Sequence, residues 1–287
     1  MKRFLSVVAV LMLPLALFAQ RDKVGTSVSL VGQITPETMA EIKAAGIDYI
    51  EVTMNNFVRK QPENEVYIKA YQALKDIKEA GLRVWSVHLP YSSTWDVSII
   101  DPKKREEAVS FFEEMIRLAG IFSPEVLVLH PGADNIKNAN TRADRLKCAR
   151  NSIGRLALAA ADIDAELCVE ILPRTCPGRT ADEIDYLTRD IPNVKICFDT
   201  NHLLIDGHDD VFAKVGDRIG TVHISDYDRV DEKHWLPLSG RGVIDWPAFC
   251  RNLKKCGYKG VFMFESRGDG VDADDVVRVY KQMKQMK

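Results

Sequence analysis

The sequence lacks several patterns that would place it in a common class of protein. It has no block of Lys and Arg residues, and its formal net charge is −2, so nucleic acid is a poor candidate partner. None of its six cysteines forms a C-x-x-C pair, and their spacings specify no disulfide. It also has no G-x-S-x-G motif, so a serine nucleophile of that kind finds no support.

The first 19 residues differ from the rest of the chain. Lys2 and Arg3 precede an almost wholly apolar run over residues 5–18, and Ala19 and Gln20 follow. This order is typical of a secretory signal peptide cleaved after Ala19, and the run is too short for a good transmembrane span. We therefore expect an exported bacterial protein, periplasmic or secreted, that does not stay inserted in a membrane. A buried N-terminal strand or helix is the alternative.

From Val24 onward, short β-branched apolar runs alternate with longer amphipathic stretches. The runs predicted as strands are 25–31, 48–53, 83–88, 126–130, 166–171, 195–199, 220–224 and 260–265. The stretches predicted as helices are 36–45, 65–80, 103–119, 142–161, 181–188, 209–215, 246–255 and 273–285. Eight strands in strict alternation with helices predict a parallel sheet, which closes on itself in a (β/α)8 TIM barrel. We expect residues 20–287 to form this one domain.

Local signals support the helix boundaries and weaken the main alternative fold. Thr35 followed by Pro36 predicts a helix N-cap. Glycines fall just past four predicted helix ends, where a left-handed residue is often needed; they are Gly46, Gly81, Gly120 and Gly257. A doubly wound open sheet would need a glycine-rich first turn to bind a nucleotide, and residues 30–33 contain no G-x-G-x-x-G.

Seven consecutive predicted strands carry an ionisable residue at or close to the carboxyl end. In the order of the strands, these are Glu51, His88, His130, Glu170, Asp199, His223 and Glu265. In a barrel these ends converge on one mouth, where active sites lie. Without a counter-charge, clustered carboxylates would repel one another and their pKa values would rise, and a divalent cation removes that conflict. Ligation by both His and carboxylate favours Mn²⁺ or Co²⁺, with Zn²⁺, Fe²⁺ or Mg²⁺ as alternatives.

The segments around these residues form a recognisable set. They are Val87-His88-Leu89-Pro90, Leu129-His130-Pro131-Gly132, Val169-Glu170-Ile171, Phe198-Asp199-Thr200-Asn201-His202, Val222-His223-Ile224 and Phe264-Glu265-Ser266-Arg267. Together they resemble the sugar phosphate isomerase/epimerase superfamily, which has the xylose isomerase-like TIM barrel fold and includes ketose 3-epimerases and relatives of AP endonuclease family 2. The resemblance covers essentially all residues after the leader.

The ketose 3-epimerase branch implies a specific site. By resemblance, one divalent metal is held by Glu170, Asp199, His223 and Glu265. Glu170 and Glu265 would also be the catalytic residues, moving a proton next to a sugar carbonyl through an enediolate. His202 and Arg229 match substrate-binding residues, and the remaining candidates for substrate contact are Arg174, His88, His130 and Glu51. The loop over residues 226–241, with Trp235, is expected to cover part of the mouth. The expected partner is a small carbohydrate, and the sequence leaves open whether two chains form a homodimer.

Other functions remain open at this stage. Cys176 stands where the epimerases carry a further glutamate, which argues against a free ketohexose as substrate. A lyase or dehydratase acting on 3-keto-glycosides or inososes could use the same site. An AP-endonuclease-like phosphodiesterase with three zinc ions would take ligands from the same strand ends, His202 included, but Asp231 and His234 stand as D-x-x-H instead of its D-x-H pair. A non-catalytic sugar-binding barrel and two-carboxylate glycoside hydrolysis are further alternatives.

Overall fold

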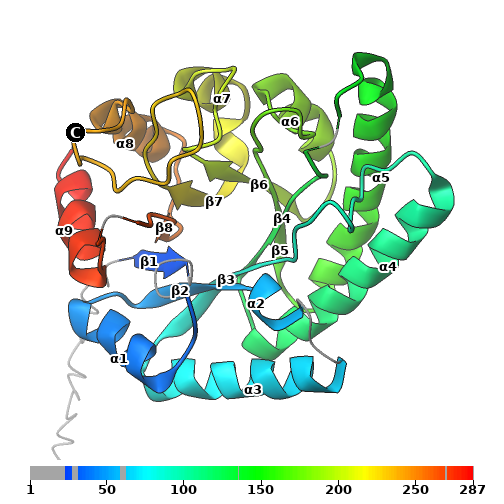
Figure 1. Ribbon diagram of the computed structural model, residues 1–287. Coiled ribbons are helices and arrows are strands. Elements are labelled where there is room, and N and C mark those ends of the chain that lie inside the picture. The colour runs from blue at the N-terminus through cyan, green and yellow to red at the C-terminus, as the bar shows by residue number, and fades with distance from the viewer. Residues whose placement is uncertain (1–22, 28–31, 59–62, 135, 269, 287) are drawn as a thin grey trace, which may run out of the picture.

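The computed structural model describes residues 23–27, 32–58, 63–134, 136–268 and 270–286. Eight parallel strands form a closed barrel in the order of the sequence, and helices surround it (Figure 1). The strands are β1 (Val24–Ser27), β2 (Tyr49–Thr53), β3 (Arg83–His88), β4 (Val126–Leu129), β5 (Glu166–Glu170), β6 (Val194–Asp199), β7 (Ile219–Ile224) and β8 (Phe262–Phe264). The predicted (β/α)8 barrel is therefore confirmed and the open sheet is excluded. The predicted signal peptide lies outside the described residues.

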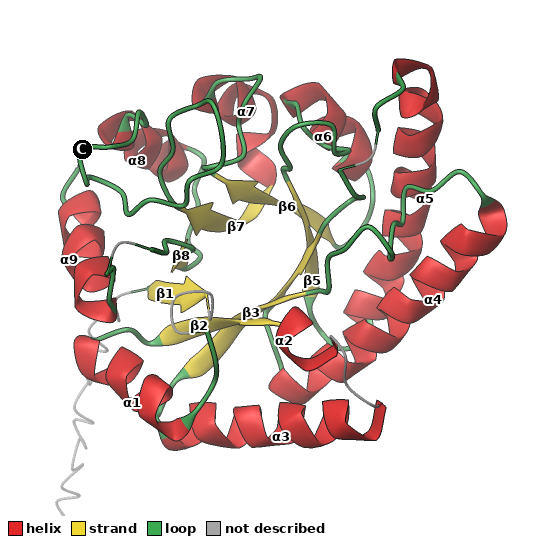
Figure 2. Cartoon of the chain, in the orientation of Figure 1, coloured by secondary structure: helices red, strands yellow, loops and turns green. Residues whose placement is uncertain are grey.

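Helices follow the strands as the amphipathic pattern predicts (Figure 2). They are α1 (Pro36–Ala45), α2 (Asn55–Val58), α3 (Glu63–Glu79), α4 (Pro102–Ala119), α5 (Arg142–Ala161), α6 (Ala181–Thr188), α7 (His208–Val215), α8 (Trp246–Lys255) and α9 (Ala273–Lys284), with short 3₁₀ turns η1 (Gly120–Phe122), η2 (Ala139–Thr141) and η3 (Gly216–Arg218). The short helix α2 and the 3₁₀ turns are additions to the predicted elements. Within the described part of the chain, no helix is both long and apolar enough to cross a membrane.

The helix ends follow the predicted chemistry with one exception. Thr35 caps α1 in a reciprocal arrangement with Thr38. Gly46, Gly81 and Gly257 have φ values of 101°, 73° and 77°, as predicted. The prediction for Gly120 is wrong: its φ is −56° because α4 runs on into η1, and Ser123 takes the left-handed conformation at φ 48°.

The barrel interior explains how the strands build a site. Side chains alternate along a strand, so residues two apart point the same way. An apolar layer that includes Val128, Cys168, Cys197 and Met263 fills the interior. His130, Glu170, Asp199 and Glu265 follow these residues by two positions. The alternation therefore places these four side chains directly above this apolar layer.

Candidate active site

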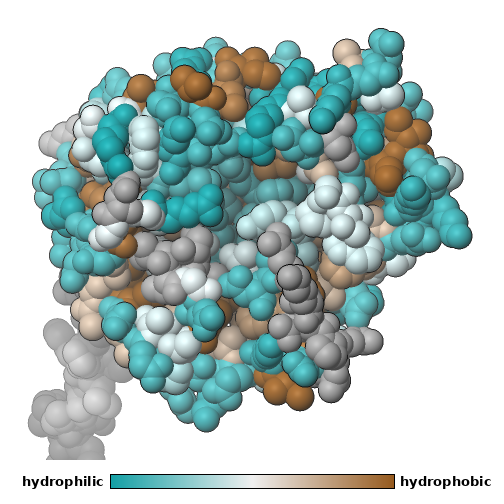
Figure 3. Space-filling view, viewed as in Figure 1, coloured by the Kyte–Doolittle hydropathy of each residue, from teal (hydrophilic) through white to brown (hydrophobic). Residues whose placement is uncertain are grey.

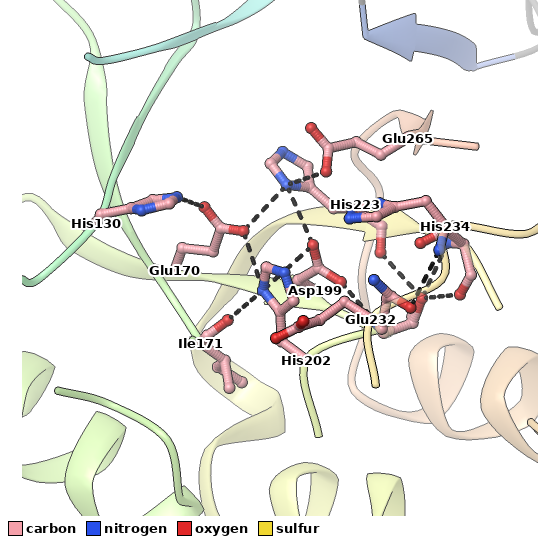
Figure 4. A network of polar contacts seen from close by, with 12 residues as sticks. His130, Glu170, Ile171, Asp199, His202, His223, Glu232, His234 and Glu265 are labelled. Carbon is pink, nitrogen blue, oxygen red and sulfur yellow. Dashed lines mark hydrogen bonds and ion pairs between the residues drawn. The ribbon is translucent and has the colours of Figure 1, made fainter. Parts of the chain in front are cut away.

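Three carboxylates surround one imidazole nitrogen at the carboxyl end of the barrel (Figure 4). Nδ1 of His223 lies 3.6 Å from Oε1 of Glu170, 3.8 Å from Oδ2 of Asp199 and 3.5 Å from Oε2 of Glu265. Glu170, Asp199 and His223 belong to β5, β6 and β7 and are buried, and Glu265 directly follows β8. These are the four residues predicted to hold the metal, and the structure brings them together.

Two atoms of this cluster show whether a cation fits there. Nδ1 of His223 and Oδ2 of Asp199 are buried and have no hydrogen-bond partner among the described residues, which is costly for polar atoms. Burial raises the pKa of Asp199 well above its usual range, and repulsion from Glu170 and Glu265 adds to this. A divalent cation would give both atoms a partner and neutralise the repulsion. One imidazole and three carboxylates therefore fit the predicted metal.

A buried carboxylate orients His223 from behind. Nε2 of His223 lies 3.0 Å from Oε2 of Glu51, and Oγ of Ser86 donates a 2.7 Å hydrogen bond to the same oxygen. Because the carboxylate accepts the Nε2 proton, the form of the ring that could bind a metal has its lone pair on Nδ1, which faces the other carboxylates. Glu51 is fully buried and does not line the cavity described below, so the structure does not place it where it would contact a substrate.

Two further imidazoles hold Glu170. Its Oε2 lies 3.1 Å from Nε2 of His88 and 2.9 Å from Nε2 of His130. Nδ1 of His88 also donates to the carbonyl of Leu89 over 2.9 Å. Burial alone would lower the pKa of His88, but the hydrogen bond to Glu170 and the charge of that carboxylate raise it to about 9. The contact with Glu170 therefore favours the protonated form of His88.

Among the described residues, three groups could each hold a metal ion. They are His88, His130 and Glu170; Glu51, His223 and Glu265; and Glu170, Asp199 and His202. Glu170 is common to two of them. The single-metal and three-zinc hypotheses thus differ at the His88 and His130 side of the site.

His202 reaches the site from the turn after β6. Its Nδ1 donates to the carbonyl of Ile171 over 2.9 Å. Burial lowers the pKa of His202 to about 4, so the ring is neutral and its Nε2 carries a lone pair. Because His202 lines the cavity, this nitrogen can accept a hydrogen bond from a hydroxyl group.

A cavity of about 270 Å³, here called the inner cavity, lies over these residues. It is lined by Ser27, Gly32, Thr53, Asn56, His88, Tyr91, His130, Glu170, His202, His234, Glu265 and Arg267. A second cavity of about 420 Å³, the outer cavity, shares five of these residues, namely Tyr91, His130, His202, His234 and Arg267. Hydrophilic side chains gather on this face of the molecule (Figure 3).

Three residues that line both cavities have no role assigned from the sequence. The ring of Tyr91 stacks on His130 with centroids 4.9 Å apart and an interplanar angle of 21°. Arg267 follows Glu265 by two positions and lies within one of the recognised segments, which is a signal that could have identified it. His234 comes from the loop after β7, and no simple spacing rule points to it.

Two arginines are placed differently from each other. Arg174 lies at the rim of the outer cavity and pairs with Asp134 over 2.6 Å and with Glu232. Arg229 is exposed and lines neither cavity, so the structure does not bring it to the site. The loop that carries Arg229 instead contributes Glu232 and His234 to the outer cavity. Trp235 pairs with Asp226 through backbone hydrogen bonds at the start of this loop.

Comparisons with known proteins agree with this architecture. A ketose 3-epimerase from Arthrobacter globiformis is 29% identical over 219 residues, which cover 71% of this chain and 70% of that protein. An inosose dehydratase from Lacticaseibacillus casei is 24% identical over 226 residues, which cover 69% and 76%. The crystal structure of a D-tagatose 3-epimerase-like protein has a TM-score of 0.76 at 22% identity, and covers 92% of this chain and 97% of that chain. The family model of the xylose isomerase-like TIM barrel matches residues 39–285. The chain therefore belongs to the xylose isomerase-like TIM barrel family.

Proposed function

We propose that this protein is a divalent-metal-dependent sugar isomerase or epimerase that moves a proton at the carbon next to a carbonyl. The observation that carries the proposal is the position of two carboxylates, Glu170 and Glu265. Both line the inner cavity and both lie within 3.6 Å of Nδ1 of His223. Figure 4 shows them on either side of that imidazole. Two carboxylates in one cavity can remove a proton and return one on the opposite face.

The remaining residues support this chemistry. A cation held by Glu170, Asp199, His223 and Glu265 would polarise the carbonyl and stabilise the negative charge of an enediolate. Mn²⁺ or Co²⁺ suits this donor set. His88 and His130 bind Oε2 of Glu170, which leaves Oε1 to face the centre of the cluster. His202 would accept a hydrogen bond from a substrate hydroxyl, and Glu51 would position His223 without touching substrate.

Solvent deuterium exchange tests the reaction class. Residues 20–287 with Mn²⁺ would be incubated in D₂O with ketoses, inososes and 3-keto-glycosides. We expect deuterium at the carbon next to the carbonyl, together with an epimer or isomer of the substrate. Loss of water or of the glycosidic group from the exchanged substrate would instead assign a lyase, as the similarity to an inosose dehydratase suggests. Absence of exchange across this panel would contradict enediolate chemistry and favour a non-catalytic barrel.

A phosphodiesterase with three zinc ions is the second candidate. The group of His88, His130 and Glu170 favours it, because the two histidines contact one of the four proposed ligands, Glu170, and could hold another ion with it. Metal analysis after dialysis against Zn²⁺ separates the two functions. One ion per chain is expected for the epimerase, and three would support the phosphodiesterase.

A further inference from the structure

The site extends beyond the space above the proposed metal ligands. The outer cavity has a volume of about 420 Å³, compared with about 270 Å³ for the inner cavity. The two share the side chains of Tyr91, His130 and His202. A ligand that reacts in the inner cavity therefore has room to continue outward between the loops that follow β3, β4, β5 and β7.

Aromatic and hydroxyl side chains line one wall of the outer cavity. Tyr91, Ser92, Ser93 and Trp95 all come from the segment after β3. Trp95 stacks on Phe111 of α4, with centroids 4.0 Å apart and an interplanar angle of 10°. Packing thus holds this ring in place before any ligand binds. Aromatic faces suit the apolar CH surface of a sugar, and hydroxyl groups can pair with its polar edge.

A second wall is held by a half-buried arginine. Arg142 of α5 donates hydrogen bonds to the carbonyls of Thr175 and Cys176 and pairs with Glu183. These contacts fix the segment after β5 that carries Arg174 and Cys176 into the cavity lining. Because the backbone of this wall is already fixed, less conformational entropy is lost when a ligand binds.

The charged side chains at the rim do not favour a phosphorylated ligand. The guanidinium of Arg174 is paired with two carboxylates, those of Asp134 and Glu232. Arg267 also lines the outer cavity, so the Asp, Glu and Arg side chains of the lining have a net charge of zero and offer no excess positive charge to attract a phosphate group. Its carboxylate oxygens can still accept hydrogen bonds from hydroxyl groups.

We propose that the outer cavity is a second subsite, which binds an uncharged sugar ring joined through a glycosidic bond to the keto-sugar that reacts in the inner cavity. The preferred substrate is then a glycoside and not a free or phosphorylated monosaccharide. This inference rests on the proposed function, because the inner cavity must hold the reacting ring.

A variant that fills the outer cavity tests the proposal. Ala133 lines the outer cavity and not the inner one, so Ala133→Phe takes up the second subsite alone. Ala213→Phe is the matched control. Ala213 lies in a groove between α7 and α8 and lines neither the inner nor the outer cavity. The substrates are 3-keto-glucose, 3-keto-cellobiose oxidised on its non-reducing ring, and 3-keto-glucose 6-phosphate. The readout is kcat/KM for deuterium exchange with Mn²⁺ present.

We expect 3-keto-cellobiose to be exchanged about tenfold more efficiently than the other two sugars, an effect of about 1.4 kcal/mol. Ala133→Phe should abolish this preference and leave exchange of 3-keto-glucose unchanged, and Ala213→Phe should change neither. Equal kcat/KM for the monosaccharide and the disaccharide, or a preference that survives Ala133→Phe, overturns the second subsite while the proposed function stands. Absence of exchange with all three sugars, while a ketose or an inosose is exchanged, overturns the second subsite alone, and absence of exchange with every sugar contradicts both proposals.

A second variant guards against a folding defect. If Ala133→Phe loses exchange of 3-keto-glucose together with its cooperative thermal transition, Ser93→Trp replaces it. Ser93 is exposed and belongs to the wall formed by the segment after β3, so a large side chain there can occupy the outer cavity without entering the core. The same loss of disaccharide preference is expected, and its persistence counts against the subsite.

Discussion

Glu51 and His223 form a buried pair, with Oε2 of the carboxylate 3.0 Å from Nε2 of the imidazole. The three proposed carboxylate ligands lie near the other ring nitrogen. A carboxylate behind a ligating histidine fixes the tautomer and raises the basicity of the ligand. The pair therefore links a residue outside the cavity to the strength of the proposed metal site.

Replacement of this carboxylate should weaken metal binding. Glu51→Gln keeps the size of the side chain but removes its charge, so we expect the affinity for Mn²⁺ to fall by about 10- to 100-fold. Isothermal titration calorimetry measures it. Ser86→Ala removes only the 2.7 Å hydrogen bond to Oε2 and should have a smaller effect. An unchanged Mn²⁺ affinity in Glu51→Gln would refute the positioning role.

The two cavity carboxylates should be needed for turnover more than for metal binding. We expect Glu170→Gln or Glu265→Gln to lower kcat by roughly 10²- to 10⁴-fold, the usual contribution of a general acid or base, while most Mn²⁺ binding remains. Glu107→Gln on the exposed face of α4 is the matched control and should keep full activity. Full activity in either cavity variant would remove that residue from proton transfer.

Strand positions were predictable from the sequence because the period of two is strict inside a barrel. Once the apolar runs are placed, residues such as Glu170 and Asp199 must point inward at the ends of their strands. The four proposed ligands converge for this reason. The apolar layer beneath them follows from the same alternation, since Cys168 and Cys197 each precede a site residue by two positions.

The loops follow different rules, and there the sequence was less informative. Asp226 accepts hydrogen bonds from the backbone of Tyr227 and Ile244 and from Nε1 of Trp246. These contacts fold the loop after β7 back on itself. Its middle then presents His234 to the cavity, while Arg229 stays outside. Such long-range contacts have no periodic signature, so spacing after a strand could not identify the right side chain.

Metal removal should lower stability, and a histidine variant should report the number of ions. Mn²⁺ at about 100 times its Kd should stabilise the fold by about 2.7 kcal/mol relative to the chelated protein, seen as a higher Tm. If one ion binds, His88→Gln should keep one equivalent of metal, and His223→Ala, which leaves no ligand atom at that position, should lose it. Loss of metal equivalents in His88→Gln would indicate that the His88 and His130 group also binds an ion.

Acid should destabilise the fold partly through His208, which begins α7 and packs near Phe198, Phe249 and Tyr227. Burial lowers the pKa of His208 to about 4 from its ordinary value of 6.5. Its Nε2 donates a 2.9 Å hydrogen bond to the carbonyl of Thr200. The neutral ring is thus favoured in the folded state, and a positive charge at a helix N-terminus would add to the cost of protonation.

The sign of the effect follows from proton linkage. The unfolded chain takes up a proton at His208 as the pH falls through 6.5, whereas the folded chain takes it up only near pH 4. The contribution of His208 to the free energy of unfolding is therefore complete above pH 6.5 and is lost between pH 6.5 and pH 4. The loss amounts to at most about 3 kcal/mol, because each pKa unit corresponds to about 1.4 kcal/mol and water at the exposed edge of the ring reduces it. His208→Gln retains a hydrogen-bond donor without titrating.

The free energy of unfolding, measured with urea from pH 7 to pH 4, should therefore decline more steeply for the natural chain than for His208→Gln. Parallel curves would mean that His208 has the same pKa in both states, because every other titrating group is common to the two proteins.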